Sequence, residues 1–234
     1  MNKLIDMSNS QIMRAKMQLT GGTQELAFAD FWAREDLPAV APAFLVLLNQ
    51  IMRASVPLMI EARDICAKRR SDGPLFVALE EYYAKHVPEE TDHDTWTLDD
   101  LDAVGFPRDQ VLGLTPAPDV AAMVGAQYYW LHHHHPVMLM GYIAILEGSP
   151  PPAAHLDWLE EAAGLGKDAW RTYRFHGDVD PHHLQDLNDA IDAMPLTRHE
   201  MSLIGISAVH TSNGLAQCVN QLDPSDAPDR VTNE

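Results

Sequence analysis

Three segments of the sequence carry histidines and carboxylates at spacings that suit a metal ion. The most distinctive runs His176-Gly-Asp-Val-Asp180-Pro-His-His183, in which His176, Asp180 and His183 stand four and then three residues apart. On an α-helix these three side chains lie along one face. Two imidazoles and one carboxylate on one face can bind a metal from one side only, so other segments have to complete the site.

Pro181 leaves two interpretations of this segment open. Asp180 followed by Pro181 is a good helix start, with Asp as the N-cap and Pro as the first helical residue. Alternatively, one continuous helix is kinked at Pro181, and all three side chains converge on a metal. We favour the continuous helix, because a helix start does not need two histidines at these offsets.

A second set of donors stands near the middle of the chain. His86, Glu90 and His93 recur at i, i+4 and i+7, and Glu90 and His93 have the Glu-x-x-His spacing of di-iron carboxylate bundles. Glu89 and Asp94 point to other sides of the same predicted helix. Because Glu-x-x-His is short and common, a solvated polar face is an equally good explanation of this segment alone.

Glu147 ends a mostly apolar segment, Gly141-Tyr-Ile-Ala-Ile-Leu-Glu147, and helical spacing puts it on the face of Met140 and Ile143. A carboxylate on an apolar face is costly unless it is paired or bound to a metal. Taken alone, exposure at the helix end beside Gly148 is the simpler explanation, since charged groups are seldom fully buried.

Four consecutive histidines, His132 to His135, point around a helix and cannot all bind one metal. We interpret them as exposed or packed side chains, some of which could line a substrate channel. The mixed nitrogen and oxygen donors of the other three segments suit non-haem iron or manganese better than a thiolate site would.

The composition limits which binding partners and which cellular compartment we expect. Sixteen basic and 34 acidic side chains among 234 residues give a net charge of −18, which disfavours nucleic acid or an anionic membrane as the partner. Cys66 and Cys218 stand far apart without a CxxC pair, so we expect a reducing compartment. No signal peptide pattern and no apolar run near the roughly 20 residues of a membrane span is evident. We therefore expect a cytoplasmic protein.

Apolar periodicity predicts an all-α fold in a single domain. We expect an N-terminal arm or short helix over 1–23, a helical domain over 24–222, and a polar tail without fixed structure over 223–234. A Pro- and Gly-bearing connection is expected over 105–119, and a bend near Pro136. The predicted helices cover 25–34, 39–70, 75–94, 98–104, 119–147, 153–163, 167–175, 181–193 and 196–222.

Residues 75–215 resemble the haem-oxygenase-like diiron oxidases and oxygenases. The resemblance rests on three motifs: His86-x-x-Glu89-Glu90-x-x-His93-Asp94, Tyr128-Tyr129…His135-Pro136…Gly141-Tyr142…Leu146-Glu147-Gly148, and His176-x3-Asp180-x2-His183. It implies one haem-oxygenase-like bundle of about seven core helices that forms a homodimer. It also implies two iron ions per chain, as Fe(II)/Fe(III), and O2 as a co-substrate. The haem-degrading and thiamin-degrading relatives fit less well, because no His precedes His86 and neither cysteine is near the motifs.

Carried over by motif, the resemblance implies the metal ligands Glu90, His93, Glu147, His176, Asp180 and His183, with His86 as the alternative to Glu90. Glu147 and Asp180 would also have catalytic roles. The expected activity is oxidation of a small organic substrate (an amino acid, amine or fatty acid derivative) by N-oxygenation, C–H oxidation or oxidative C–C cleavage. We expect the pocket around Phe76, Tyr82, Tyr129, Met140 and Ile206. The alternatives are a metal-free scaffold of the same fold, acting as a cofactorless oxidase or small-molecule binding protein, and a non-enzymatic acidic partner protein.

Overall fold

The longest helix, α3 (Leu37–Lys68), forms the centre of a bundle in which it packs against α4 (Pro74–Glu90), α5 (His93–Ala103) and α7 (Pro118–His133). By length and composition α3 could cross a membrane, so the expectation that no apolar segment is long enough was wrong. The core helix of a folded bundle passes the same test. More than half of the most apolar part of α3 is buried inside this bundle.

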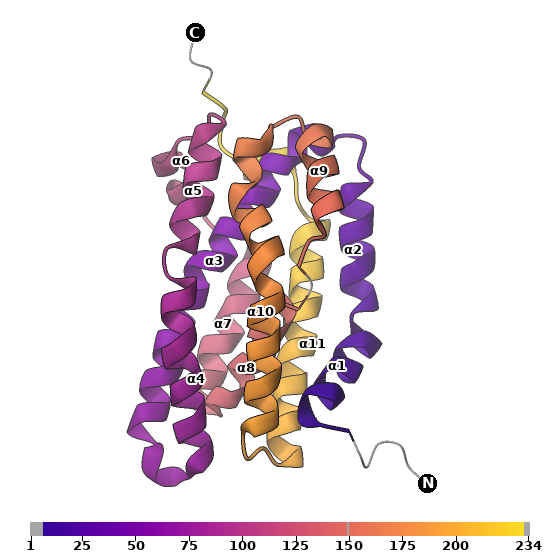
Figure 1. Cartoon of the computed structure of the whole chain (residues 1–234). Coiled ribbons are helices and arrows are strands. Elements are labelled where there is room, and N and C mark those ends of the chain that lie inside the picture. Colours follow the sequence, from indigo (N-terminus) through magenta and orange to yellow (C-terminus); the bar gives the residue numbers. More distant parts are fainter. Residues whose placement is uncertain (1–6, 149, 232–234) are drawn as a thin grey trace.

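The computed structural model describes residues 7–148 and 150–231, and its helices stand side by side in one bundle (Figure 1). The described residues form eleven α-helices and four 3-10 helices, with no strand, which confirms the predicted all-α fold. The remaining α-helices are α1 (Asn9–Thr20), α2 (Gly22–Trp32), α6 (Arg108–Gly113), α8 (Leu139–Leu146), α9 (Ala153–Ala162), α10 (Arg171–Ala193) and α11 (Arg198–Asn220). The 3-10 helices are η2 (Arg70–Asp72), η3 (Pro136–Met138), η4 (Lys167–Trp170) and η5 (Pro224–Asp226).

Helix α11 packs against α8, α2, α7 and α1 and closes the side of the bundle away from α4 and α5. Gly141 allows α8 to approach α11 closely. A Cβ at this position would overlap the backbone oxygen of Ile204 and lie 2.7 Å from the backbone nitrogen of Ala208. This contact holds the apolar helix α8, and the carboxylate that follows it, against the rest of the core.

The predicted helix over 75–94 is two helices, so that prediction was wrong. Helix α4 ends at Glu90, Thr91 is extended, and Asp92 has φ 74°, after which α5 begins at His93. Pro88 removes one backbone donor in the last turn of α4, and Asp tolerates the left-handed conformation better than most residues. Glu90 and His93 therefore belong to different helices.

Pro181 lies inside one continuous helix, α10, so the expected continuous helix is confirmed and the separate helices over 167–175 and 181–193 do not form. The break near Pro136 is also found, because α7 ends at His133, η3 follows, and α8 starts at Leu139. The connection over 105–119 contains the short helix α6, which the sequence did not indicate.

The C-terminal residues up to Val231 lie against the bundle, so the expectation of a tail without fixed structure was wrong for 223–231. Arg230 Nε donates to the carbonyl of Val104 at 2.7 Å, and Val231 N donates to the carbonyl of Gly105 at 2.8 Å. Residues 1–6 of the predicted N-terminal arm and 232–234 of the predicted tail lie outside the described residues.

Candidate metal centre

Seven histidine and carboxylate side chains meet inside the bundle. They come from α4, α5, the residue that ends α8, and α10: His86, Glu90, His93, Glu147, His176, Asp180 and His183. Two groups within this set have donor atoms that all lie within 4.8 Å of one another. We call His86, Glu90, Glu147 and His183 the first subsite, and Glu90, His93 and His176 the second subsite. Glu90 belongs to both.

The first subsite contains a short hydrogen bond between His86 and Glu147 and an ion pair between His183 and Glu90. His86 Nε2 and Glu147 Oε1 are 2.7 Å apart, and His86 Nδ1 lies 3.0 Å from Glu89 Oε2. His183 Nδ1 forms an ion pair with Glu90 Oε1 at 3.1 Å. The four side chains therefore turn their donor atoms toward one another, as ligands of one ion would.

The second subsite is built in the same way from α4, α5 and α10. Glu90 Oε2 is 3.0 Å from His93 Nδ1, so the two oxygens of this carboxylate face the two subsites. His176 Nδ1 and Asp180 Oδ1 are 2.9 Å apart, and His176 Nε2 has no hydrogen bond. Asp180 Oδ1 also lies 3.9 Å from His183 Nδ1, which places this carboxylate between the subsites.

The close contacts between carboxylates and imidazoles perturb their pKa values. Burial would lower the pKa of His86, but Glu147 and Glu89 outweigh burial and raise this pKa to about 9. Burial would raise the pKa of Glu90, but His183 and His93 together hold it below its usual range. Burial raises the pKa of Glu147 despite the contact with His86. The cluster is therefore an array of mutually compensating charges, and a metal ion would displace protons from its imidazoles.

Hydrogen bonds fix α5 and α10, the two helices that carry the histidines of the second subsite. Asn49 Nδ2, on α3, donates to the carbonyl of Asp94 and to Thr97 Oγ1, each at 2.9 Å, which ties the first turn of α5 to the core. Asp100 on α5 accepts from the backbone N–H of Thr172 at 2.7 Å and from Arg171 Nε at 2.9 Å. Since Thr172 is in the first turn of α10, Asp100 satisfies one of the free N–H groups at this helix start.

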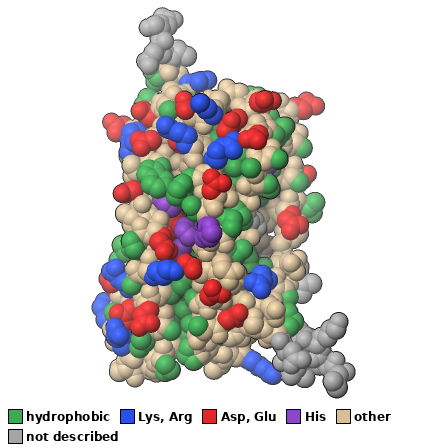
Figure 2. Space-filling view, in the orientation of Figure 1, with side chains coloured by type: hydrophobic (Ala, Val, Ile, Leu, Met, Phe, Trp, Pro, Cys, Tyr) green, Lys and Arg blue, Asp and Glu red, His purple; other side chains and the backbone are tan. Residues whose placement is uncertain are grey.

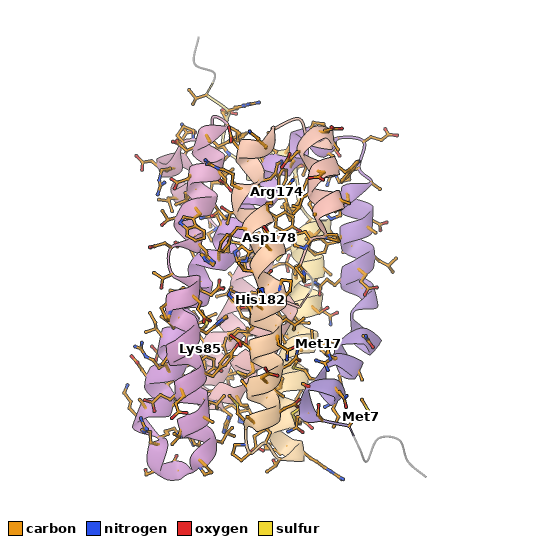
Figure 3. The ribbon with its side chains drawn as sticks, viewed as in Figure 1. Met7, Met17, Lys85, Arg174, Asp178 and His182 are labelled. Atoms are coloured by element: carbon orange, nitrogen blue, oxygen red, sulfur yellow. The ribbon has the colours of Figure 1, made fainter. Side chains whose placement is uncertain are left out.

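Helix α10 presents two faces of different character. His176 and Asp180 are buried, whereas Asp178 and His182 are exposed on the outward face together with Arg174, as Figure 3 shows. Figure 2 shows histidine and acidic side chains gathered near the middle of this side of the molecule. The i, i+4, i+7 spacing predicted from the sequence thus separates the candidate ligands from their solvent-exposed neighbours.

A cavity of about 740 Å³ adjoins the cluster. Its wall is mostly apolar and comes chiefly from α1, α2, α3 and α8, including Phe28, Trp32, Phe44, Leu48, Ile51 and Tyr142. Glu90, Glu147, His176 and Asp180 contribute to the same wall, so the cavity reaches both subsites. Largely apolar spaces of this size with a few convergent polar groups are typical of small-molecule sites.

The sequence-based expectation for the pocket was wrong. Phe76, Tyr82, Tyr129, Met140 and Ile206 do not line the cavity, and Tyr129 and Ile206 are more than half exposed. Apolar side chains on several helices have the same periodicity, and the sequence does not tell which of these faces surrounds a cavity. The aromatic and apolar residues of α2 are the sequence feature that could have indicated the cavity wall.

Two further expectations about polar residues are settled by the geometry. Glu89 does not point elsewhere but contacts His86, because the two residues stand three apart on α4 and are neighbours on the helix surface. The four consecutive histidines stay outside the cluster: His132 Nε2 lies 3.5 Å from Glu61, and His135 accepts a hydrogen bond from Val137 N.

The donor set fits a pair of non-haem metal ions. Two buried ligand-type atoms, Glu147 Oε2 and His176 Nε2, have no hydrogen-bond partner, and Glu90 Oε1 and His183 Nδ1 have only each other. Each unpaired buried polar group costs about 1–3 kcal/mol, a cost that coordination would remove. The set contains nitrogen and oxygen donors and no thiolate, which suits iron or manganese.

This bundle has the haem-oxygenase-like fold. A crystal structure of a domain of unknown function with a heme oxygenase-like fold, from Shewanella denitrificans OS217, superposes with a TM-score of 0.69 at 14% identity, covering 91% of this chain and 87% of that one. A TenA homolog from Pseudomonas syringae pv. tomato str. DC3000 superposes with a TM-score of 0.62 at 10% identity, covering 88% of this chain and 92% of that one. At these identities the likeness concerns the fold alone.

Residues 65–222 match the family of iron-containing redox enzymes. Since this match covers more than half of the sequence, the chain belongs to that family. No curated protein matches it. The family description agrees with the nitrogen and oxygen donor set of the cluster, which the fold and the sequence motifs place at the centre of the bundle.

Proposed function

We propose that this chain is a non-haem diiron oxidase or oxygenase that uses O2 to oxidise a small organic substrate. The observation that carries the proposal is the pair of donor groups that share Glu90 and border one large apolar cavity. Membership of the iron-containing redox enzymes supports it. A single ion would leave either Glu147 Oε2 in the first subsite or His176 Nε2 in the second without a partner.

In this proposal two iron ions bind per chain, and the ligands include Glu90, His93, Glu147, His176, Asp180 and His183. Bound iron supplies the redox equivalents and the coordination positions at which O2 reacts. Glu90 presents one oxygen to each subsite, with Oε1 3.1 Å from His183 Nδ1 and Oε2 3.0 Å from His93 Nδ1, and His176 Nε2 has no hydrogen-bond partner. The protein therefore holds its donors in place before metal binds, which reduces the reorganisation that binding requires.

The cavity determines what can reach the cluster. Its mostly apolar wall favours a substrate with substantial apolar surface. Glu147 and Asp180 stand in this wall, so both carboxylates would contact the bound substrate. Of the expected substrates, those with an apolar chain or ring fit this wall better than a small, fully polar molecule.

The test is an anaerobic Fe(II) titration of the full chain, followed by exposure to O2. We expect two irons per chain and an oxygen-dependent change in visible absorption. His176→Ala and His183→Ala should each lower the iron stoichiometry, whereas His182→Ala, next to His183 but exposed on the outward face, should not. Two irons retained in both site variants would refute the ligand assignment, and substrate turnover that a chelator does not affect would favour the metal-free scaffold.

A further inference from the structure

The sequence motifs present His86 as an alternative to Glu90, but both side chains reach the cluster. We propose that His86 is an additional ligand of the first subsite, bound through Nε2, and that Glu89 is the residue that positions its ring. The inference rests on the proposed function, because it requires a metal pair. It goes beyond that function by adding a seventh protein ligand and a positioning carboxylate.

The position of Nε2 carries the argument. This atom is 2.7 Å from Glu147 Oε1 and belongs to the group whose donor atoms, on His86, Glu90, Glu147 and His183, all lie within 4.8 Å of one another. The ring is buried, with 2% of the residue exposed. Glu147 Oε2 has no hydrogen bond, and Glu90 Oε1 and His183 Nδ1 have only each other, 3.1 Å apart. A ring that only held Glu147 would leave Glu147 Oε2 without a partner, whereas an ion among the four side chains would bind it together with the other donors.

The other ring nitrogen is arranged as in a metal-bound histidine. His86 Nδ1 lies 3.0 Å from Glu89 Oε2, and the Glu89 side chain is about one-third exposed, outside the cluster. A carboxylate that accepts the Nδ1–H bond fixes the tautomer that leaves the Nε2 lone pair free for a metal. Tyr82 stacks on the imidazole with ring centroids 5.5 Å apart, and His183 meets it edge-on at 5.2 Å, so the ring plane is also fixed.

This assignment changes the number of protein ligands that each of the two subsites offers. Without His86, the first subsite has three protein ligands, Glu90, Glu147 and His183. The second subsite has His93, His176 and Glu90, with Asp180 beside them. With His86, each ion meets two imidazoles and two carboxylates, so we expect the wild-type chain to bind two ions with similar affinities.

The experiment is an anaerobic Co(II) titration of the full chain in competition with a chromophoric chelator, with the visible Co(II) bands recorded. His86→Ala should separate the two binding steps, leaving one unchanged and weakening the other by about 100-fold or more, since loss of a mere supporting residue costs 10- to 100-fold. Added imidazole should restore the weakened step and its visible bands. Glu89→Gln should keep two ions and weaken one of them about 10-fold. Glu81→Gln, an exposed residue of the same helix, is the matched control and should change nothing.

The outcomes separate this inference from the proposed function. A wild-type chain that binds no Co(II) and no Fe(II) overturns both. Two ions in the wild type, with unchanged affinities and bands in His86→Ala and no effect of imidazole, overturn the role of His86 alone. Circular dichroism should show that the variants fold. If His86→Ala does not fold, His86→Gln and Glu89→Gln decide by the same measurement, and unchanged affinity in both refutes the inference.

Discussion

Asp100 links the two helices that carry His93 and His176, and replacing it should both destabilise the protein and weaken the second subsite. Its side chain is 5% exposed, and its two oxygens accept from Arg171 Nε and from the backbone N–H of Thr172. Thr172 stands one helical turn before His176. Asp100→Ala therefore releases the first turn of α10 next to a candidate ligand.

The magnitude follows from these contacts. A hydrogen bond from an N–H to a buried carboxylate contributes about 1.5–3 kcal/mol, and a negative charge at a helix N-terminus adds about 0.3–1 kcal/mol. The ion pair adds little, because the Arg171 side chain is 54% exposed and exposed pairs contribute about 0–1 kcal/mol. We expect Asp100→Ala to lower the free energy of unfolding by about 2–4 kcal/mol, and Asp100→Asn to cost less because one acceptor oxygen remains.

The assay is urea unfolding followed by circular dichroism, with a chelator present so that metal binding does not add to the measured stability. Asp102→Ala, an exposed Asp on the same helix, is the control and should stay within about 0.5 kcal/mol of wild type. A loss below about 0.5 kcal/mol for Asp100→Ala would show that Asp100 does not hold the start of α10. Unchanged Co(II) affinity at both subsites would show that this helix start does not position His176.

Two further predictions concern glycines in the helices and the reactivity of the two buried thiols. Gly141→Ala should destabilise the protein by about 1–3 kcal/mol, because the new methyl group meets the backbone of α11. Gly125→Ala in α7, where a Cβ meets nothing within 4 Å, should stabilise it by about 0.5–1 kcal/mol, and thermal unfolding of the pair compares them. Burial raises the pKa of the Cys66 and Cys218 thiols to about 12, so both should resist alkylation until the protein unfolds. Fast labelling of the native chain, read by mass spectrometry, would contradict this.

Helical periodicity is a local property, and it predicted the parts of the site that lie on one helix. His176, Asp180 and His183 share a face of α10 because four and seven residues make about one and two turns. The same rule predicted a continuous helix around Asp92, where one helix ends and the next begins. Glu90 and His93 still meet, because α4 and α5 both pack against α3.

The contact between Glu89 and His86 is also local, because the two residues stand three apart on α4. The remaining parts depend on how distant segments pack, which spacing does not encode. The cavity combines residues of α1, α2, α3 and α8, whose apolar faces look alike in the sequence. Val231 joins the bundle through a backbone hydrogen bond to Gly105, and backbone hydrogen bonds of this kind leave no trace in residue type.

The order of the candidate ligands along the chain has a consequence for biosynthesis. They extend from His86 to His183, and α11, which closes α8 against the core, follows all of them. During translation no stretch of the nascent chain shorter than this contains both subsites, and the contacts that join them are long-range and slow to form. Under the proposed function, metal would therefore bind both subsites only after His183 has left the ribosome and α10 has packed against α5.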